Sequence, residues 1–359
     1  MLHHTFQLIF LNYFSMAGST KNHFISSMLL LGLLIMATLD STVAQVGVCY
    51  GRNGNGLPSN PSQVVALYNQ NNIRRMRIYD PDQPTLQALS GSNIELILDV
   101  PNPDLENLAS NQANANTWVQ NNVQNYPNVR FRYIAVGNEV SPVRPETSQY
   151  VNFVLPALQN IYNAISAASL GNQIKVSTAV DTRVLGNAYP PADGVFRSDV
   201  NDYLNPIIGF LANTDAPLLV NIYPYFSYID DPSNIPLEYA LFTSDGIVVP
   251  GGVRYQNLFY ATLDAMYAAL EKSGGSNVVI VVSESGWPSA GFPVATVENS
   301  RLYNTNLLQR VRDGTPKRPG RAIETYVFSM LDEDQKSPEI EKNFGIFLAN
   351  GQPKYPISF

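Results

Sequence analysis

The stretch FRYIAVGNE, residues 131–139, joins an apolar run to a short polar end. Its first part has the aromatic and β-branched side chains that favour a buried strand. Gly137, Asn138 and Glu139 follow at once, so a carboxylate stands where the strand ends. Because active sites of β/α barrels form at the carboxyl ends of their strands, this stretch indicates both a fold and a place for a site.

Similar segments recur along the chain. Short β-branched runs give eight expected strands, at 46–51, 73–80, 94–101, 131–139, 174–181, 218–225, 277–284 and 324–332. Stretches long enough for a crossover helix follow several of them, at 61–71, 106–126, 150–168, 255–272 and 299–313. Eight strand and helix units predict an α/β protein, a single (β/α)8 TIM barrel with its active site at the C-terminal rim of the strands. The alternative is an open doubly wound sheet, but no Gly-x-Gly-x-x-Gly turn follows any strand.

The first 44 residues are interpreted as a secretory signal peptide, and 45–359 as one catalytic barrel domain. The apolar run 25–39 follows a lone Lys21, and Thr42-Val43-Ala44 supplies the small residues that signal peptidase accepts. A membrane anchor is the alternative, but this run is short for a span. No Pro/Ser-rich linker divides the remainder, so we expect one domain.

The few histidine and cysteine residues exclude more kinds of catalytic site than the net charge does. The net charge of −7 and the lack of a basic tract argue against a nucleic-acid partner. All three histidines lie in the leader, which excludes Ser-His-Asp catalysis and histidine-ligated metal sites from the mature domain. Cys49 has no partner for an internal disulfide and no histidine to activate it, so a buried, inert thiol is expected. Carboxylates must carry the chemistry of an enzyme of this composition.

Two glutamates stand where such chemistry is expected. Glu139 ends the fourth strand and Glu284 the seventh, each after an apolar run, with Asn138 placed to orient the first and Ser283 and Ser285 the second. Partial desolvation raises one carboxyl pKa, and the charge of the other carboxylate separates the two pKa values further. A salt-bridge role at the rim is the alternative for either glutamate alone. Their joint position favours an acid and nucleophile pair.

Aromatic rings and amides close the other strands. Sugars present flat C–H faces ringed by hydroxyl groups, which rings and amides suit well. The predicted binding residues of this kind are Tyr79, Asn138, Asn221, Tyr223, Tyr225, Phe226 and Trp287. Taken singly, each ring has core packing as its alternative. The stretches 230–252 and 286–297 are expected to be long loops that surround the site.

Six motifs carry a family resemblance that covers essentially all of 45–359. They are VGVCYG (46–51), MRIYDP (76–81), AVGNE (135–139), VNIYPYF (220–226), VSESGWP (282–288) and NFG (343–345). With them the chain resembles the plant endo-β-1,3-glucanases, glycoside hydrolase family 17, among the pathogenesis-related proteins of plant defence.

The resemblance implies endo-hydrolysis of cell-wall β-1,3-glucan with retention of configuration and no cofactor or metal. It makes Glu139 the acid/base and Glu284 the nucleophile, so their carboxyl groups are expected to lie about 5–5.5 Å apart. It adds Glu333, Lys336 and Glu341 as substrate-binding residues after strand eight. There the chain departs from the family, since LDEDQK at 331–336 replaces the commoner Phe-Asn-Glu-Asn-Gln-Lys and adds two acids.

The resemblance also favours a secreted, extracellular enzyme of the apoplast or cell wall. Vacuolar members continue past the barrel with a removable tail, whereas this sequence stops at Phe359. A monomer that binds no membrane is expected. Two functional alternatives stay open: a catalytically weak glucan-binding barrel protein, and a related β-glucanase of different linkage specificity. A glucan-binding protein without activity should lack one of the two glutamates. Linkage specificity depends on the shape of the cleft, which the spacing of residues along the sequence does not reveal.

Overall fold

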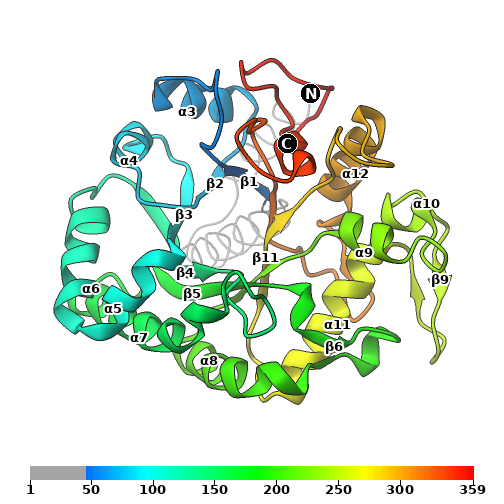
Figure 1. Ribbon diagram of the computed structural model, residues 1–359, viewed down its shortest axis with the longest axis horizontal. Coiled ribbons are helices and arrows are strands. Elements are labelled where there is room, and N and C mark those ends of the chain that lie inside the picture. Colours follow the sequence, from blue (N-terminus) through cyan, green and yellow to red (C-terminus); the bar gives the residue numbers. More distant parts are fainter. Residues whose placement is uncertain (1–45) are drawn as a thin grey trace, which may run out of the picture. The chain divides into compact units, whose positions relative to one another are not determined.

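Eight parallel strands close into a barrel in the computed structural model, which describes residues 46–359 (Figure 1). They are β1 (Val46–Tyr50), β2 (Arg75–Ile78), β3 (Glu95–Val100), β4 (Arg130–Asn138), β5 (Lys175–Asp181), β8 (Leu218–Asn221), β11 (Ile280–Ser285) and β14 (Thr325–Val327). Each strand pairs with its neighbour along the chain, and β1 pairs with β14. That last pairing closes the sheet, so the predicted (β/α)8 barrel is confirmed and an open sheet is excluded.

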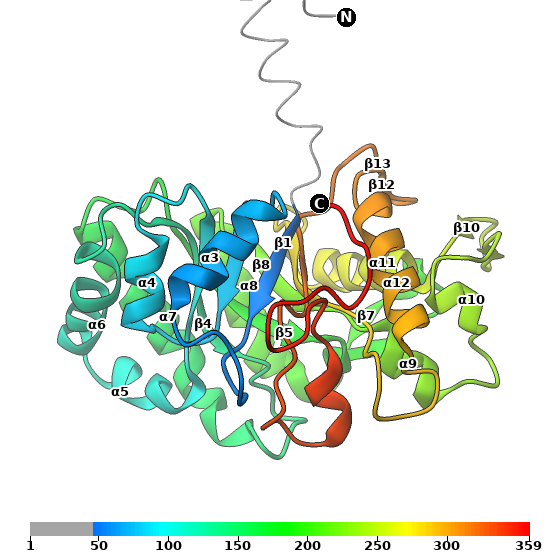
Figure 2. The same cartoon turned by 90° about the horizontal axis from the view of Figure 1, so that it is seen from above.

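Helices cover the outside of the barrel and flank its strands on both sides in the perpendicular view (Figure 2). The α-helices are α3 (Pro61–Gln70), α4 (Gln83–Leu89), α5 (Leu105–Ser110), α6 (Gln112–Val119), α7 (Val151–Ala167), α8 (Asn201–Thr214), α9 (Pro224–Asp230), α10 (Leu237–Ala240), α11 (Leu258–Lys272) and α12 (Val297–Arg310). Two-stranded hairpins pair β6 (Leu185–Asn187) with β7 (Val195–Phe196), β9 (Ile247–Val248) with β10 (Arg254–Tyr255), and β12 (Gly314–Thr315) with β13 (Arg318–Pro319). The helices expected at 61–71, 150–168, 255–272 and 299–313 are therefore present.

The helix expected at 106–126 is divided at Asn111. This residue has extended backbone angles, and its side chain accepts a hydrogen bond from the Ala113 amide at 2.8 Å. An asparagine in this role caps a new helix, because it satisfies a free amide of the first turn. The segment therefore forms α5 and α6, followed by the π-helical turn Gln120–Gln124.

Two strands end earlier than the sequence predicted. Strand six stops at Asn221 because Pro224 begins α9, and proline at the first helical position supplies no amide to a strand ladder. Strand eight stops at Val327. Beyond it the Ser329 amide donates to the Phe344 carbonyl and the Met330 amide donates to the Cys49 carbonyl. The segment around Phe344 thus takes a hydrogen bond that a neighbouring barrel strand would otherwise make.

The barrel core is made by the apolar strand residues, and a charged arginine also lies within it. Val48, Leu98, Ile134 and Val282 are fully buried, and so is Arg77 on β2. Cys49 is buried as expected, its thiol donates to the Ser283 carbonyl at 3.4 Å, and burial raises its pKa. A buried arginine requires charged partners, and these lie at the carboxyl ends of the strands.

The strands that hold the two glutamates are irregular at their ends. The pairing of β4 with β5 shifts between Ala135 and Asn138, and the pairing of β11 with both neighbours shifts after Val282. Such bulges redirect side chains and are common beside active sites. Both glutamates therefore stand at irregular strand ends on the same rim, Glu139 just past β4 and Glu284 within β11, where it pairs with Asn221. No helix within residues 46–359 has the length and apolarity needed to cross a membrane.

Candidate active site

A cavity of about 1110 Å³ lies at the carboxyl ends of the strands. Residues after β1, β2, β4, β5, β8 and β14 line it, together with Glu284 on β11. Ten residues that the sequence predicted for the site are among the lining: Tyr79, Asn138, Glu139, Asn221, Tyr223, Phe226, Glu284, Glu333, Lys336 and Glu341. The barrel therefore brings both glutamates and most of the predicted binding residues to one place.

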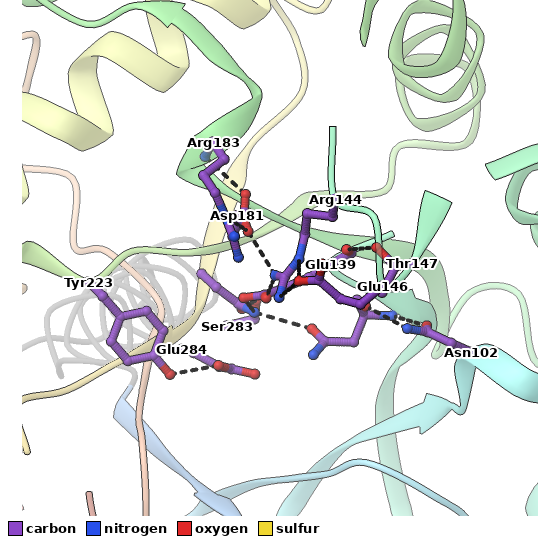
Figure 3. A network of polar contacts seen from close by, with 12 residues as sticks. Asn102, Glu139, Arg144, Glu146, Thr147, Asp181, Arg183, Tyr223, Ser283 and Glu284 are labelled. Atoms are coloured by element: carbon purple, nitrogen blue, oxygen red, sulfur yellow. Dashed lines mark hydrogen bonds and ion pairs between the residues drawn. The ribbon is translucent and has the colours of Figure 1, made fainter. Parts of the chain in front are cut away.

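Glu139 has an unusual backbone conformation. Its φ of 51° lies in the left-handed region, which residues with a Cβ rarely adopt and which is often found at functional sites. The Glu139 amide donates to the Ala179 carbonyl at 2.8 Å, and the Thr147 hydroxyl donates to the Glu139 carbonyl at 2.9 Å. These two bonds hold the strained residue so that its carboxylate enters the cavity (Figure 3).

Glu284 is 5% exposed and accepts three hydrogen bonds. Tyr79 and Arg77 both donate to its Oε1 at 2.8 Å, and Tyr223 donates to its Oε2 at 2.6 Å (Figure 3 shows the last). A carboxylate that accepts from a buried cation and two phenols is held in one orientation. A nucleophile needs such fixed positioning.

Arg77 forms a buried ion pair with Asp99, the penultimate residue of β3. Two nearly parallel bonds, at 3.1 and 2.7 Å, join the guanidinium to the carboxylate. Burial raises the pKa of Asp99 to about 6, and the Arg77 charge opposes this. The sequence analysis gave neither residue a role in the site. A charge at the end of each of two apolar strands was the signal that could have identified them.

An amide links the two glutamates. The Asn221 Nδ2 donates to Glu139 Oε1 at 2.9 Å, while its Oδ1 accepts from Arg77, which also holds Glu284. Asn138 Oδ1 accepts from Arg77 at 2.9 Å and from Asn221 at 3.2 Å, so it belongs to the same network but does not bond Glu139, the residue it was expected to orient. Because a few shared donors connect both carboxylates, a change at one end of the network affects the other.

The predicted roles of the two serines are wrong. Ser283 donates to Asn221 at 2.8 Å, and Ser285 bonds Tyr303 at 2.6 Å in the core. Neither bond reaches Glu284. Of these three successive residues of β11, only Glu284 lines the cavity. Tyr79 and Tyr223 donate to its carboxylate and orient it in place of the serines.

A second charged cluster surrounds Glu139. Arg144 contacts Glu139 Oε2 and Asp181 Oδ2, the latter at 2.8 Å, and it also pairs with Glu146 (Figure 3). Arg183 contacts the same Asp181 oxygen at 2.8 Å. The sequence analysis missed this cluster because Arg144 lies in a loop with no periodic pattern. Asp181 at the end of the fifth strand was the available signal.

The segment after β14 contributes the residues that the family resemblance implied. Glu333 is buried, accepts from the Asn53 amide at 2.8 Å and pairs with Lys336 at 2.9 Å. Gly51 is required here, because a Cβ at that position would overlap the Glu333 carboxylate. Burial raises the pKa of Glu341, an effect that Lys336 opposes.

The two extra acids of this segment point away from the cavity. Asp332 pairs with Lys354 at 2.6 Å and accepts from the Gly345 amide, and burial raises its pKa. Asp334 accepts from the Asn55 amide at 2.6 Å. Neither lines the cavity. Both acids instead fasten the segment to neighbouring loops, so their charge is used in holding Glu333 and Lys336 in place.

Two predicted binding rings, Trp287 and Tyr225, lie in the core and not in the cavity. Both are fully buried, and their rings pack edge to face with centroids 5.0 Å apart. The Trp287 indole donates to the Val294 carbonyl at 3.0 Å. The rings belong behind the cavity wall because β11 bends at its bulge and α9 begins at Pro224, which turns Tyr225 inward.

Other rings take their place. Phe328 and Phe344 line the cavity, and Tyr223 packs edge to face against both, at 6.1 and 5.7 Å. The sequence analysis gave neither phenylalanine a role. The walls also differ from expectation. After strand six the lining comes from Tyr223 and α9, and residues 286–297 do not appear in it. The segment after β14 makes the largest contribution to the lining.

Titratable residues of the described chain do not form a metal centre. Within residues 46–359, no group of three or more His, Cys, Asp or Glu side chains is placed to hold a metal ion. The carboxylates of the cavity are instead paired with arginines, lysine and hydroxyl groups. This arrangement can transfer protons and form a covalent bond through a carboxylate.

Comparisons with known proteins agree with this geometry. The model of the family described as glycosyl hydrolases family 17 matches residues 46–359. The chain is 59% identical to a glucan endo-1,3-beta-glucosidase of Vitis vinifera, over 95% of this chain and 99% of that protein. It is 55% identical to glucan endo-1,3-beta-glucosidase B of Solanum lycopersicum, over 93% of each chain.

Solved structures give the same picture. CJP38, described as a beta-1,3-glucanase and allergen of Cryptomeria japonica pollen, is 48% identical and superposes with a TM-score of 0.85, over 88% of this chain and 99% of that one. A structure from a study of two plant beta-glucan endohydrolases with distinct substrate specificities is 46% identical with a TM-score of 0.83, over 87% of this chain and all of that one.

Proposed function

Since the chain belongs to glycosyl hydrolase family 17, we propose that it hydrolyses internal β-1,3 linkages of glucan, with Glu139 as acid/base and Glu284 as nucleophile. The curated relatives support the substrate, because they are named glucan endo-1,3-beta-glucosidases. The roles of the two glutamates are supported by the different contacts that they make in the cavity.

One observation carries the proposal: carboxylates from β4 and β11 enter a single cavity and share one network of donors. Asn221 contacts Glu139, and Arg77 contacts both Asn221 and Glu284. Glycoside hydrolysis needs two carboxylates at one cavity that admits the sugar. A separation of about 5–5.5 Å between the carboxyl groups stays a prediction, as does retention of configuration.

The chemistry follows from the contacts. A Glu284 oxygen bonds to the anomeric carbon as the glycosidic C–O bond breaks, and the proton of Glu139 goes to the departing sugar oxygen. Glu139, now a carboxylate, takes a proton from water while that water displaces Glu284 from the anomeric carbon. Arg77, Tyr79 and Tyr223 stabilise the carboxylate of Glu284 before and after the covalent intermediate.

Linkage is tested by digesting linear β-1,3-glucan and cellulose side by side and sizing the products. We expect a ladder of oligomers from the first and none from the second. Cleavage of the β-1,4-linked polymer alone would establish the other linkage specificity, and tight binding without products would establish a glucan-binding protein. The comparison matters because related plant beta-glucan endohydrolases are described as having distinct substrate specificities.

We also propose secretion to the cell wall as a monomer. The composition of residues 1–44, which lie outside the described residues, supports a cleaved leader. Expression with the native leader in plant cells should release protein whose N-terminal sequence begins at Gln45. Retention inside the cell with the leader intact would contradict secretion, and light scattering at twice the chain mass would contradict a monomer.

A further inference from the structure

One oxygen of Glu139 is fixed as a hydrogen-bond acceptor. Asn221 Oδ1 accepts from Ser283 Oγ at 2.8 Å and from Arg77 Nη1 at 3.2 Å, so the other end of this amide, Nδ2, must face Glu139. An amide nitrogen donates and does not accept. A proton on Glu139 Oε1 would therefore find no acceptor in this amide. Oε2 is the oxygen better placed to carry the proton that Glu139 delivers to a leaving sugar.

Arg144 lies against that second oxygen. Its Nη1 contacts Glu139 Oε2 and, at 2.8 Å, Asp181 Oδ2, while its Nε donates to Glu146 at 3.0 Å. A guanidinium only donates and keeps its charge in proteins, so the contact favours the ionised form of Glu139 over the protonated form. In the free protein both oxygens of the proposed acid are thus occupied by donors.

We infer that Arg144 is a positioning residue that holds Glu139 as a carboxylate and must pass to Asp181 before Glu139 can act as an acid. This inference rests on the proposed role of Glu139. Asp181 already contacts the same nitrogen and is itself anchored by Arg183 at 2.8 Å. Arg144 Nη1 therefore only has to break its contact with Glu139 and keep its existing contact with Asp181. It needs no new partner.

The two halves of the reaction need opposite states of Glu139. Proton donation needs Glu139 protonated, which Arg144 opposes, and activation of water needs the carboxylate, which Arg144 favours. Arg144 also lines the cavity, so it borders the space that glucan fills. Because Arg144 lies between Glu139 and Asp181, its movement from one carboxylate to the other would switch Glu139 between its base form and its acid form.

Other charged side chains also influence Arg144 and Glu139, so the experiment needs a control variant. Those facing Arg144 and Glu139, from the same loop and from β5, β11 and the segment after β14, are Glu146, Asp181, Arg183, Glu284, Lys336 and Glu341. Arg183 is the matched control, because it contacts the same Asp181 oxygen as Arg144 while bonding Asp181 and not Glu139 within the described residues.

The test is a carbon-13 NMR titration of Glu139 in protein labelled at glutamate, with the resonance identified by its loss in Glu139→Gln. In Arg144→Met the pKa of Glu139 should rise by about 1–3 units, the range that loss of an adjacent opposite charge produces. Arg183→Met should raise it by less than half as much. An unchanged pKa in Arg144→Met, or equal shifts in both variants, would overturn the inference.

Two further measurements keep this test informative. Circular dichroism melting shows whether Arg144→Met is folded, and Arg144→Gln serves as the second neutral variant if it is not. In kinetics, the alkaline limit of kcat/KM should move to higher pH in the Arg144 variant, and a loss that is uniform at every pH would contradict the inference. The titration needs no substrate, whereas failure of the proposed function would appear as an unmodified protein that leaves β-1,3-glucan intact.

Discussion

Glu139 and Glu284 are the same residue type in different surroundings, and these surroundings fit the different roles proposed for them. Glu284 accepts from one guanidinium and two phenols, which fix both of its oxygens. Glu139 accepts from an amide and contacts a guanidinium that a second carboxylate also binds. The first arrangement holds a carboxylate in one position, as a nucleophile requires, and the second suits a group that must change protonation during turnover.

Alanine at each glutamate should therefore give different losses. Glu284→Ala removes the nucleophile and should abolish hydrolysis of every substrate. Glu139→Ala should lose a factor of about 10²–10⁴ on glucan, the range for general acid catalysis, and much less in the first step on an aryl glucoside oligomer with an activated leaving group. Burst kinetics on both substrates measure this. Equal losses on the aryl substrate would contradict the assignment of roles.

Arg77 should matter for stability as well as for catalysis. Arg77→Met leaves Asp99 and Glu284 buried without their cation, and breaking a buried pair costs about 3–5 kcal/mol. Arg52→Met removes a more exposed arginine that pairs with Asp80, and should cost less than about 1 kcal/mol. Urea unfolding of both variants gives the two free energies. Similar values for both would show that Arg77 is not the buried support described here.

At the scale of elements, the sequence predicted strands better than their ends. All eight barrel strands were expected from β-branched runs, because burial on both faces leaves an unbroken apolar signature. The early ends of β8 and β14 depend on Pro224 and on insertion of residues near Phe344, respectively. The first is local and could have been foreseen. The second is a contact between distant segments, which no local pattern reveals.

The same difference between local patterns and distant contacts explains which site residues could be predicted from the sequence. Glu139 and Glu284 were predictable because each follows an apolar strand directly. Trp287 was misassigned because the bulge in β11 decides which of successive side chains faces the cavity, and the period-two pattern does not contain that irregularity. Arg144 was missed because its partner Asp181 comes from the next strand, and the pair exists only after the barrel forms.

The segment after β14 should make stability depend on pH through Glu341. Burial raises the pKa of Glu341 above its ordinary value of 4.5, so the folded state binds more protons than the unfolded state between the two pKa values. The free energy of unfolding therefore falls as pH rises through that window. Glu341→Gln lacks this fall, so its melting temperature should change less between about pH 4 and pH 7 than that of the unmodified protein.

Glu339→Gln is the control for that prediction. Glu339 lies on the same 3₁₀ turn (Glu339–Asn343) and pairs with Lys342 on the surface. Its variant should keep the pH dependence of the unmodified protein. If Glu341→Gln and Glu339→Gln behave alike, burial of Glu341 does not produce the effect.

At the scale of the whole molecule, the barrel gathers residues from most of its strands around one large cavity. Its volume of about 1110 Å³ lies above the common range for small-molecule pockets, about 300–1,000 Å³. Tyr79 and Phe226 line it on segments far apart in the sequence. A cavity with this lining has room for several sugars at once, as an enzyme that cuts within a long polymer requires.

Short oligomers should then be poor substrates. Contacts with remote sugars can help to distort the central sugar toward its transition state, so truncation should lower kcat as well as affinity. Measuring kcat/KM for β-1,3-linked oligomers of about two to seven units should show a steep rise with length. A flat profile with glucose released one unit at a time would indicate an exo-acting pocket.

The covalent intermediate offers the most direct test of the account. A β-1,3-linked oligosyl fluoride with fluorine at C2 of the reacting sugar destabilises the transition states and allows the glycosyl-enzyme to accumulate. Mass spectrometry of the digested protein should find one added glycosyl group, attached to the peptide that contains Glu284. Attachment to Glu139 or to another residue, or rapid turnover to the inverted sugar with no adduct, would contradict the assignment of Glu284 as nucleophile.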